Sequence, residues 1–129
     1  MRVLVDTHTL LFFVDDSPRL PPRVKSIIEQ EDTEAFVSSA SLWEITIKYG
    51  LGHLQLSVPL ERLLHDQLVA DDIVPLPILP AHLVTLSVLP QRKHRDPFDR
   101  LIAATCLAED LILLSKDTEF DPYGIRRVW

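Results

Sequence analysis

Short apolar runs alternate along this chain with longer segments in which apolar residues recur at helical spacing. Runs of a few residues that are rich in valine and leucine are typical of buried strands. Because parallel strands are joined by helical crossovers, this alternation predicts an α/β fold, a three-layer α/β/α domain with a mostly parallel central sheet. The expected strands are 2–5, 35–38, 73–79, 111–115 and 125–129, and the expected helices are 7–14, 21–30, 38–50, 60–70, 80–89 and a last one that begins at Pro97.

Composition limits both the class and the location of the protein. With 129 residues, 47% of them hydrophobic, and a mean hydropathy of +0.12, the chain is expected to form one domain over residues 1–129. The net charge of −6 argues against holding nucleic acid by bulk positive charge, so any such contact must be local. No stretch approaches membrane-spanning length, no convincing signal peptide begins the chain, and the single cysteine fits a reducing compartment. We therefore expect a cytoplasmic protein.

Two aspartates stand at the start of the helix that begins at Pro97. Proline fits the first helical position, which makes Asp96 the N-cap and Asp99 the third helical residue. Steps of three and four residues from Asp99 reach Ile102 and Ala103, so its carboxylate shares a face with residues expected in the core. A carboxylate on such a face needs an ion pair, a capping role or a metal ion.

Two further aspartates lie at the carboxyl ends of predicted strands. Asp6 ends the strand 2–5, and Asp117 comes soon after the strand 111–115. In open α/β sheets, ligands bind at the carboxyl ends of the strands. The alternative is that each aspartate only caps a turn or helix. If the two strands are neighbours, both carboxylates come together, and the helix mouth at Asp99 closes the same pocket.

Glu44 lies within the predicted helix 38–50 and has two interpretations. It could face solvent and pair with Lys48 at i+4, a surface pair worth about 0.3–0.5 kcal/mol. It could instead point toward the edge of the sheet that carries Asp6. The helical pattern alone favours the solvent-facing position.

A pocket that gathers these acids needs a cation. At roughly 5 Å and an effective dielectric constant near 20, each charged pair costs about 3 kcal/mol, so the pocket binds protons or a hard divalent ion. Oxygen ligands suit Mg²⁺ or Mn²⁺, whereas the chain has neither a Cys/His cluster for zinc nor a glycine-rich phosphate loop. The basic run beside the helix mouth could be a solvated loop, but its position favours contact with a nucleic-acid backbone. Its members, together with the next helix's arginine, are Arg92, Lys93, His94, Arg95 and Arg100.

Four runs of the chain each contain one or more of these acids. They are Val3-Leu4-Val5-Asp6-Thr7-His8, Ser39-Ala40-Ser41-Leu42-Trp43-Glu44-Ile45, Asp96-Pro97-Phe98-Asp99-Arg100-Leu101-Ile102-Ala103-Ala104 and Leu113-Leu114-Ser115-Lys116-Asp117. In that order they resemble the PIN-domain ribonucleases, specifically the VapC-type toxins of bacterial toxin–antitoxin pairs. The resemblance spans nearly the whole chain.

The resemblance implies a PIN-like domain that cuts single-stranded or looped RNA with Mg²⁺ or Mn²⁺ in an acidic pocket. Carried over by motif, the metal-binding and catalytic acids are Asp6, Glu44, Asp99 and Asp117. Asp96 could support these ligands or a second cation, and Thr7 and Ser39 could support them by hydrogen bonds. The RNA-binding residues would be Arg92, Lys93, Arg95 and Arg100. The resemblance also implies a homodimer and a cognate antitoxin that inhibits the enzyme.

Two other functions compete with this one. A non-catalytic PIN-fold protein-binding module would keep the fold and show no metal-dependent cleavage. A phosphoacceptor signalling domain also keeps acids at strand ends, but it would need adjacent acids after the first strand, which Asp6-Thr7-His8 does not supply.

Overall fold

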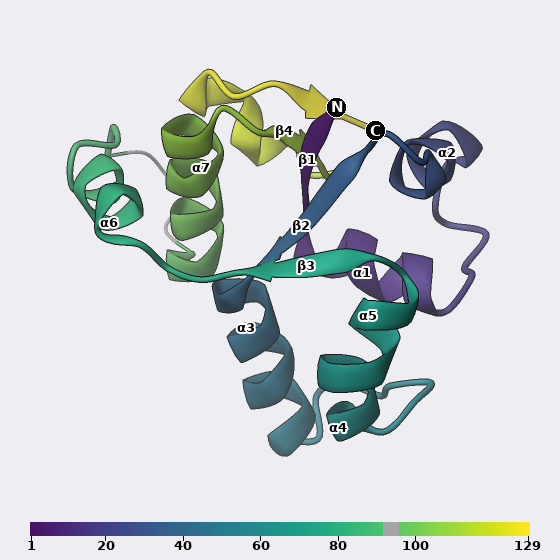
Figure 1. Ribbon diagram of the computed structural model, residues 1–129. Helices are drawn as coiled ribbons and strands as arrows, with labels where there is room; N and C mark the ends of the chain where they lie inside the picture. Colours follow the sequence, from purple (N-terminus) through teal and green to yellow (C-terminus); the bar gives the residue numbers. More distant parts are fainter. Residues whose placement is uncertain (92–95) are drawn as a thin grey trace.

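The centre of the molecule is a five-stranded parallel sheet. The computed structural model describes residues 1–91 and 96–129, and within them the strand order is β3-β2-β1-β4-β5. All four strand pairings are parallel, which confirms the predicted α/β architecture (Figure 1). The strands are β1 (Arg2–Val5), β2 (Glu34–Ser38), β3 (Ile73–Leu76), β4 (Ile112–Leu114) and β5 (Arg127–Val128).

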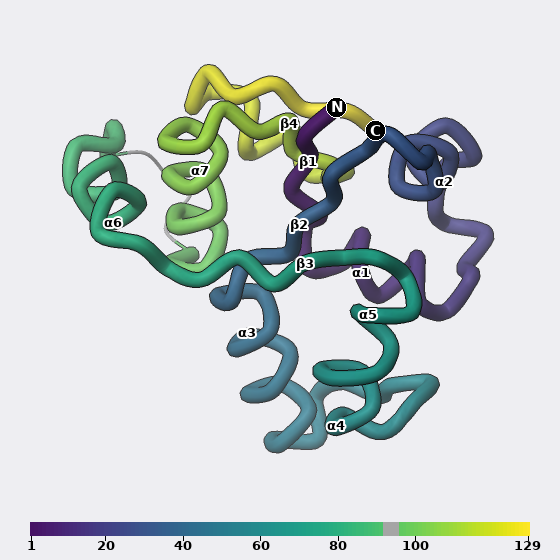
Figure 2. Tube along the Cα trace, in the orientation of Figure 1, coloured from purple at the N-terminus to yellow at the C-terminus, as the bar shows by residue number. Residues whose placement is uncertain are grey.

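Helices cover both faces of this sheet. One face packs against α6 and α7, and the other packs against the remaining helices, as the two traces show (Figures 1 and 2). Seven α-helices are described: α1 (Thr7–Val14), α2 (Pro22–Glu29), α3 (Ser39–Gly50), α4 (Leu60–Arg62), α5 (Leu68–Ala70), α6 (Pro80–Ser87) and α7 (Pro97–Glu109).

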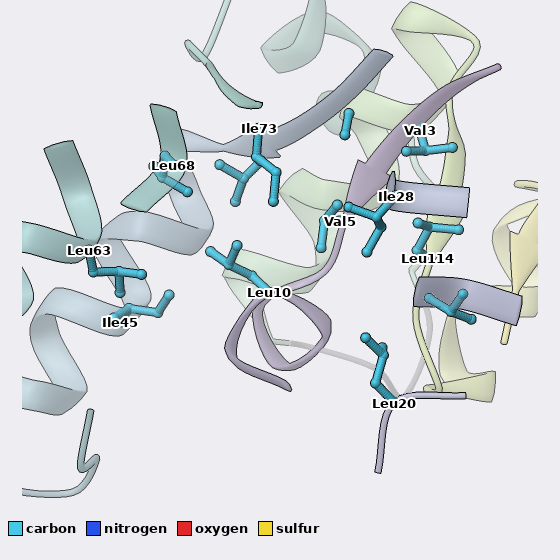
Figure 3. Packing of buried hydrophobic residues seen from close by; sticks show 13 residues of the cluster. Val3, Val5, Leu10, Leu20, Ile28, Ile45, Leu63, Leu68, Ile73 and Leu114 are labelled. Atoms are coloured by element: carbon cyan, nitrogen blue, oxygen red, sulfur yellow. The ribbon is translucent and has the colours of Figure 1, made fainter. Parts of the chain in front are cut away.

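Side chains alternate between two apolar cores because successive strand residues point to opposite faces. Val3 and Val5 face the core that also holds Leu10 of α1 and Leu114 (Figure 3). Leu4 faces the other core, which is built largely from α7. The two cores fix β1 on both sides, so the residue that follows β1 has a well-defined position.

Three segments differ in detail from the predicted elements. The expected helix 60–70 contains a π-helical turn at Leu63–Gln67 between α4 and α5. The strand expected at 73–79 ends at Leu76 and lies at a sheet edge, as its prolines require. The last strand is only two residues long, and a 3-10 helix, Thr118–Tyr123, precedes it.

In the described part of the chain, no helix is both long enough and apolar enough to cross a bilayer.

Candidate functional site

A cleft of about 390 Å³ opens at the carboxyl ends of the strands, and it gathers every acid that the sequence nominated. Parallel strands end at one edge of a sheet, so residues following β1 and β4 meet there, and α3 and α7 close the sides. The described residues lining the cleft are Asp6, Thr7, His8, Glu44, Lys48, Asp96, Asp99, Lys116, Asp117 and Thr118.

Asp6 is the most buried aspartate of the cleft, with 5% of its surface exposed. One carboxylate oxygen accepts a hydrogen bond from the Thr7 amide at 2.7 Å, and the other accepts one from Ser115 Oγ at 2.7 Å. Burial raises the pKa of Asp6 because the charged form loses hydration, although both hydrogen bonds act in the opposite direction. Asp6 therefore caps α1 and lies in the cleft, so the two interpretations of this residue are compatible.

Glu44 is buried, so the solvent-facing position favoured by the helical pattern is wrong. Its Oε1 accepts a hydrogen bond from Thr7 Oγ1 at 2.8 Å, and its Oε2 lies 2.8 Å from Lys48 Nζ. The expected i,i+4 pair exists, but it faces the cleft because α3 packs against α1 and α7. The helical spacing did not reveal the buried position of Glu44, because a face that meets a polar cleft carries the same residue types as a face that meets solvent.

The two aspartates of α7 have different surroundings. Asp96 Oδ1 accepts hydrogen bonds from the amides of Phe98 (2.9 Å) and Asp99 (3.1 Å), which confirms the predicted N-cap. Asp99 is half-buried in the first turn and lines the cleft. The proline at the first helical position thus sets both carboxylates at the mouth of α7.

Asp117 lies across the cleft from α3, in the segment that follows β4. Its carboxylate caps the 3-10 helix by accepting a hydrogen bond from the Glu119 amide at 2.9 Å, and its own amide donates to Ser115 Oγ at 3.1 Å. Ser115 Oγ therefore joins Asp6 to Asp117. Sequence reasoning missed Ser115, although the pairing of Val5 with Leu114 places residues 6 and 115 next to each other.

Among the described residues, the basic side chains that line the cleft are two lysines that were not among the predicted RNA-binding residues. Lys48 and Lys116 line it, and Lys116 Nζ also lies 5.4 Å from the centroid of the Phe12 ring. Arg100 does not line the cleft, because its guanidinium donates to the Pro90 carbonyl and to the Tyr123 hydroxyl. The remaining predicted RNA-binding residues lie outside the described part of the chain: Arg92, Lys93 and Arg95.

Of the two predicted supporting residues, Thr7 reaches the acids and Ser39 does not line the cleft. Ser39 opens α3, and the hydroxyl of the preceding Ser38 caps that helix by accepting from the Ala40 amide at 3.0 Å. Sequence reasoning also missed an aromatic pair near the cleft. Trp43, beside Glu44, is 59% exposed and meets Phe98 edge to face at 5.3 Å.

The donor set fits a hard divalent cation. Among the described residues, carboxylate oxygens are the most numerous metal-binding atoms in the cleft, and Asp6 is buried with a backbone amide and a hydroxyl as its hydrogen-bond donors. A buried carboxylate without a cationic partner is costly, and a metal ion would offset that cost. As the described side chains stand, no three acids, histidines or cysteines are close enough to hold one ion together. Binding an ion therefore requires side chains to turn toward it.

Comparison with protein families agrees with this architecture. The family model for the PIN domain matches residues 3–125. The chain belongs to the PIN-domain family. This PIN domain is also 30% identical over 115 residues to the Ribonuclease VapC22 of Mycobacterium tuberculosis, and the match covers 89% of this chain and 86% of that relative.

Solved structures share the fold of this PIN domain. A chain in the structure of VapBC2 from Rickettsia felis bound to a DNA fragment from their promoter superposes with a TM-score of 0.74 at 14% identity, covering 99% of this chain and 98% of that one. FitAcB from Neisseria gonorrhoeae gives a TM-score of 0.64 at 21% identity, covering 100% and 97%.

Proposed function

We propose that this PIN domain is a divalent-metal-dependent endoribonuclease that acts in the cytoplasm as the toxin of a toxin–antitoxin pair. The observation that carries the proposal is the convergence of five carboxylates on one cleft, from segments as far apart in sequence as Asp6 and Asp117. Membership of the PIN-domain family and the relative named as a VapC ribonuclease support the same activity.

Mg²⁺ or Mn²⁺ would be held by Asp6, Glu44, Asp99 and Asp117. When bound, such an ion lowers the pKa of water and stabilises negative charge on a phosphodiester, which suits hydrolysis without a covalent nucleophile. The chain's own part is to orient the ligands. Thr7 contributes its amide to Asp6 and its hydroxyl to Glu44, so one residue fixes two acids.

RNA would approach over the basic and aromatic residues around the acids. Lys116 supplies positive charge inside the cleft, which a chain of net charge −6 needs locally to accept a phosphate backbone. The exposed ring of Trp43 offers a surface on which an unstacked base can lie. Arg92, Lys93 and Arg95 remain predicted contributors.

The antitoxin would cover this cleft with a basic side chain and pack beside it on apolar surface. Such surface is exposed along α3 and at its C-cap, at Trp43, Ile47 and Leu51, and on α5 at Val69. A second apolar surface lies on α6, where Leu83 and Val84 are at least half exposed, and it would serve the homodimer.

The test is cleavage of total RNA by purified protein in Mn²⁺, with and without EDTA. Asp6→Asn should lower the rate by at least about 100-fold, because it removes a ligand charge from the cleft. Asp32→Asn makes the same chemical change in an exposed residue before β2 and should cleave like the wild type. Cleavage that survives both EDTA and Asp6→Asn would overturn the metal mechanism. Absence of any cleavage would favour the non-catalytic binding module.

A further inference from the structure

A basic and aromatic surface continues from the cleft along α1. His8 lines the cleft, and Phe12 follows one helical turn later, with the two rings 6.4 Å apart. Lys116 also lines the cleft, and its Nζ lies 5.4 Å from the centroid of the Phe12 ring. The guanidinium of Arg19, in the segment after α1, lies 5.9 Å from the same centroid. The Phe12 ring therefore connects a cation that lines the cleft with one that lies beyond it.

Both of these cations keep their charge for an anion that approaches from solvent. Lys116 and Arg19 are exposed, and within residues 1–91 and 96–129 neither forms a salt bridge. Asp16, the acid nearest to Arg19 in the sequence, is paired with Lys25 at 2.8 Å instead. A cation beside an aromatic ring is attracted without being neutralised, whereas a cation bonded to a carboxylate is neutralised. A phosphate can therefore bind both side chains where they lie.

Phe12 is itself held in place from two sides. Its half-buried side chain packs against the apolar core that contains Leu10, and the Trp129 ring lies 6.4 Å away. A fixed ring restricts the long side chains of Lys116 and Arg19 before a ligand arrives. Because flexible side chains lose entropy when a ligand immobilises them, this restriction favours binding.

We propose that single-stranded RNA leaves the cleft over α1, with one phosphate on Lys116 and a later phosphate on Arg19, and that Phe12 is the positioning residue for both cations. This inference rests on the proposed function, because it assumes that the cleft accepts RNA. Basic side chains interleaved with aromatic rings are typical of surfaces that follow a nucleic-acid strand. In a chain of net charge −6, a phosphate backbone is held only where cations gather locally, and this surface is continuous with the cleft.

The experiment measures binding of a fluorescein-labelled single-stranded RNA by fluorescence anisotropy over a series of KCl concentrations, in EDTA to prevent cleavage. For single strands, each neutralised phosphate contributes about 0.7 to the slope of log K against log salt. Arg19→Met and Lys116→Met should each make the slope shallower by about that amount, and the double variant by about twice as much.

The role of Phe12 is tested with two variants in the same assay. Phe12→Leu keeps an apolar side chain and removes the ring, so it should weaken binding roughly 3- to 10-fold, because both cations must then be ordered by the RNA. Phe12→Tyr keeps the aromatic face and should bind like the wild type. Equal affinities of Phe12→Leu and the wild type would overturn the positioning role.

The matched control is Arg126→Met, which removes the same charge where Arg126 pairs with Asp110, before β4 and β5 begin and thus at the other edge of the sheet. It should keep the wild-type slope. Wild-type slopes in Arg19→Met and Lys116→Met would overturn the inference, and the proposed function would stand if the wild type still cleaves RNA in Mn²⁺. A wild type that neither binds nor cleaves RNA would overturn both. Thermal unfolding checks that each variant is folded.

Discussion

Asp6 uses its two carboxylate oxygens for two different segments of the chain. One oxygen accepts a hydrogen bond from the first amide of α1, and the other accepts one from the hydroxyl of Ser115, the residue after β4. Neither donor is charged, so the carboxylate is stabilised by dipoles in a place that water hardly reaches. The carboxylate of Asp6 is therefore already oriented and poorly hydrated before any cation binds in the cleft.

The burial of Asp6 predicts a pH-dependent stability in the absence of metal. Its folded-state pKa lies above the ordinary 3.8, so its contribution to stability is complete below 3.8 and is lost as the pH rises through the raised pKa. Asp6→Asn removes this titration. In EDTA, the wild type should lose stability relative to Asp6→Asn as the pH rises toward neutrality. Urea unfolding over a pH series measures the difference, and a difference that does not change with pH would contradict the prediction.

Individual residues differ in how well the sequence predicts them. Asp6, Asp99 and Asp117 follow strand ends or open a helix, so the predicted topology places them at one edge of the sheet. Glu44 does not follow such a rule, because helical spacing gives a face without saying whether that face meets solvent or a cleft. Lys48 was foreseen only as its surface partner, and its place in the cleft depends on how α3 packs.

The helix α7 owes its position to both of its ends. At its start, Asp96 caps two amides. Near its last turn, Glu109 Oε1 lies 2.8 Å from Nε2 of the buried His82 on α6. Because His82 Nδ1 accepts from the Leu79 amide at 3.1 Å, Nε2 carries the ring proton and donates to Glu109. This bond ties α6 to α7 and so helps to hold the acidic mouth in place.

The capping role of Asp96 can be tested by substitution. Asp96→Ala should destabilise the fold by about 1 kcal/mol, because two amides at the start of the helix lose their acceptor. Asp96→Asn should retain most of that stability, since asparagine caps about as well. Urea unfolding in EDTA measures both. Equal losses in the two variants would show that the charge of Asp96 matters and its capping does not.

Elements were predictable to the extent that one local signal dominates. The start of α7 was foreseen because Pro97 and Asp96 each favour one helical position. The π-helical turn at Leu63–Gln67 carries no comparable signal, since its leucines suit either kind of helix. The last strand is short because it pairs with β4 only from Arg127, at an edge of the sheet.

At the scale of the whole molecule, the cleft is a property of the parallel sheet. β1 lies between β2 and β4, so Asp6 stands at the centre of the carboxyl edge with α3 and Asp117 on either side. The adjacency of β1 and β4 was posed from the sequence only as a condition, because the order of strands depends on long-range packing. The structure meets that condition.

Metal binding should stabilise the entire domain, because the ligands come from four separate segments that unfolding disperses. At free Mn²⁺ one hundred times the Kd, a single site adds about 2.7 kcal/mol. The rise in melting temperature should be seen in the wild type and in Asp32→Asn. It should be much smaller in Asp6→Asn. A rise of equal size in all three proteins would place the ion elsewhere.

The order of strands also determines when the cleft can appear during protein synthesis. β1 leaves the ribosome long before β4, although the two strands are neighbours in the sheet. The hydrogen bond between Asp6 and Ser115 joins residues that are 109 positions apart in the sequence. Contacts between distant segments form only once the later segment is available. A nascent chain therefore lacks the assembled cleft until residues up to Asp117 have emerged, so the acidic site is incomplete during most of the synthesis of this domain.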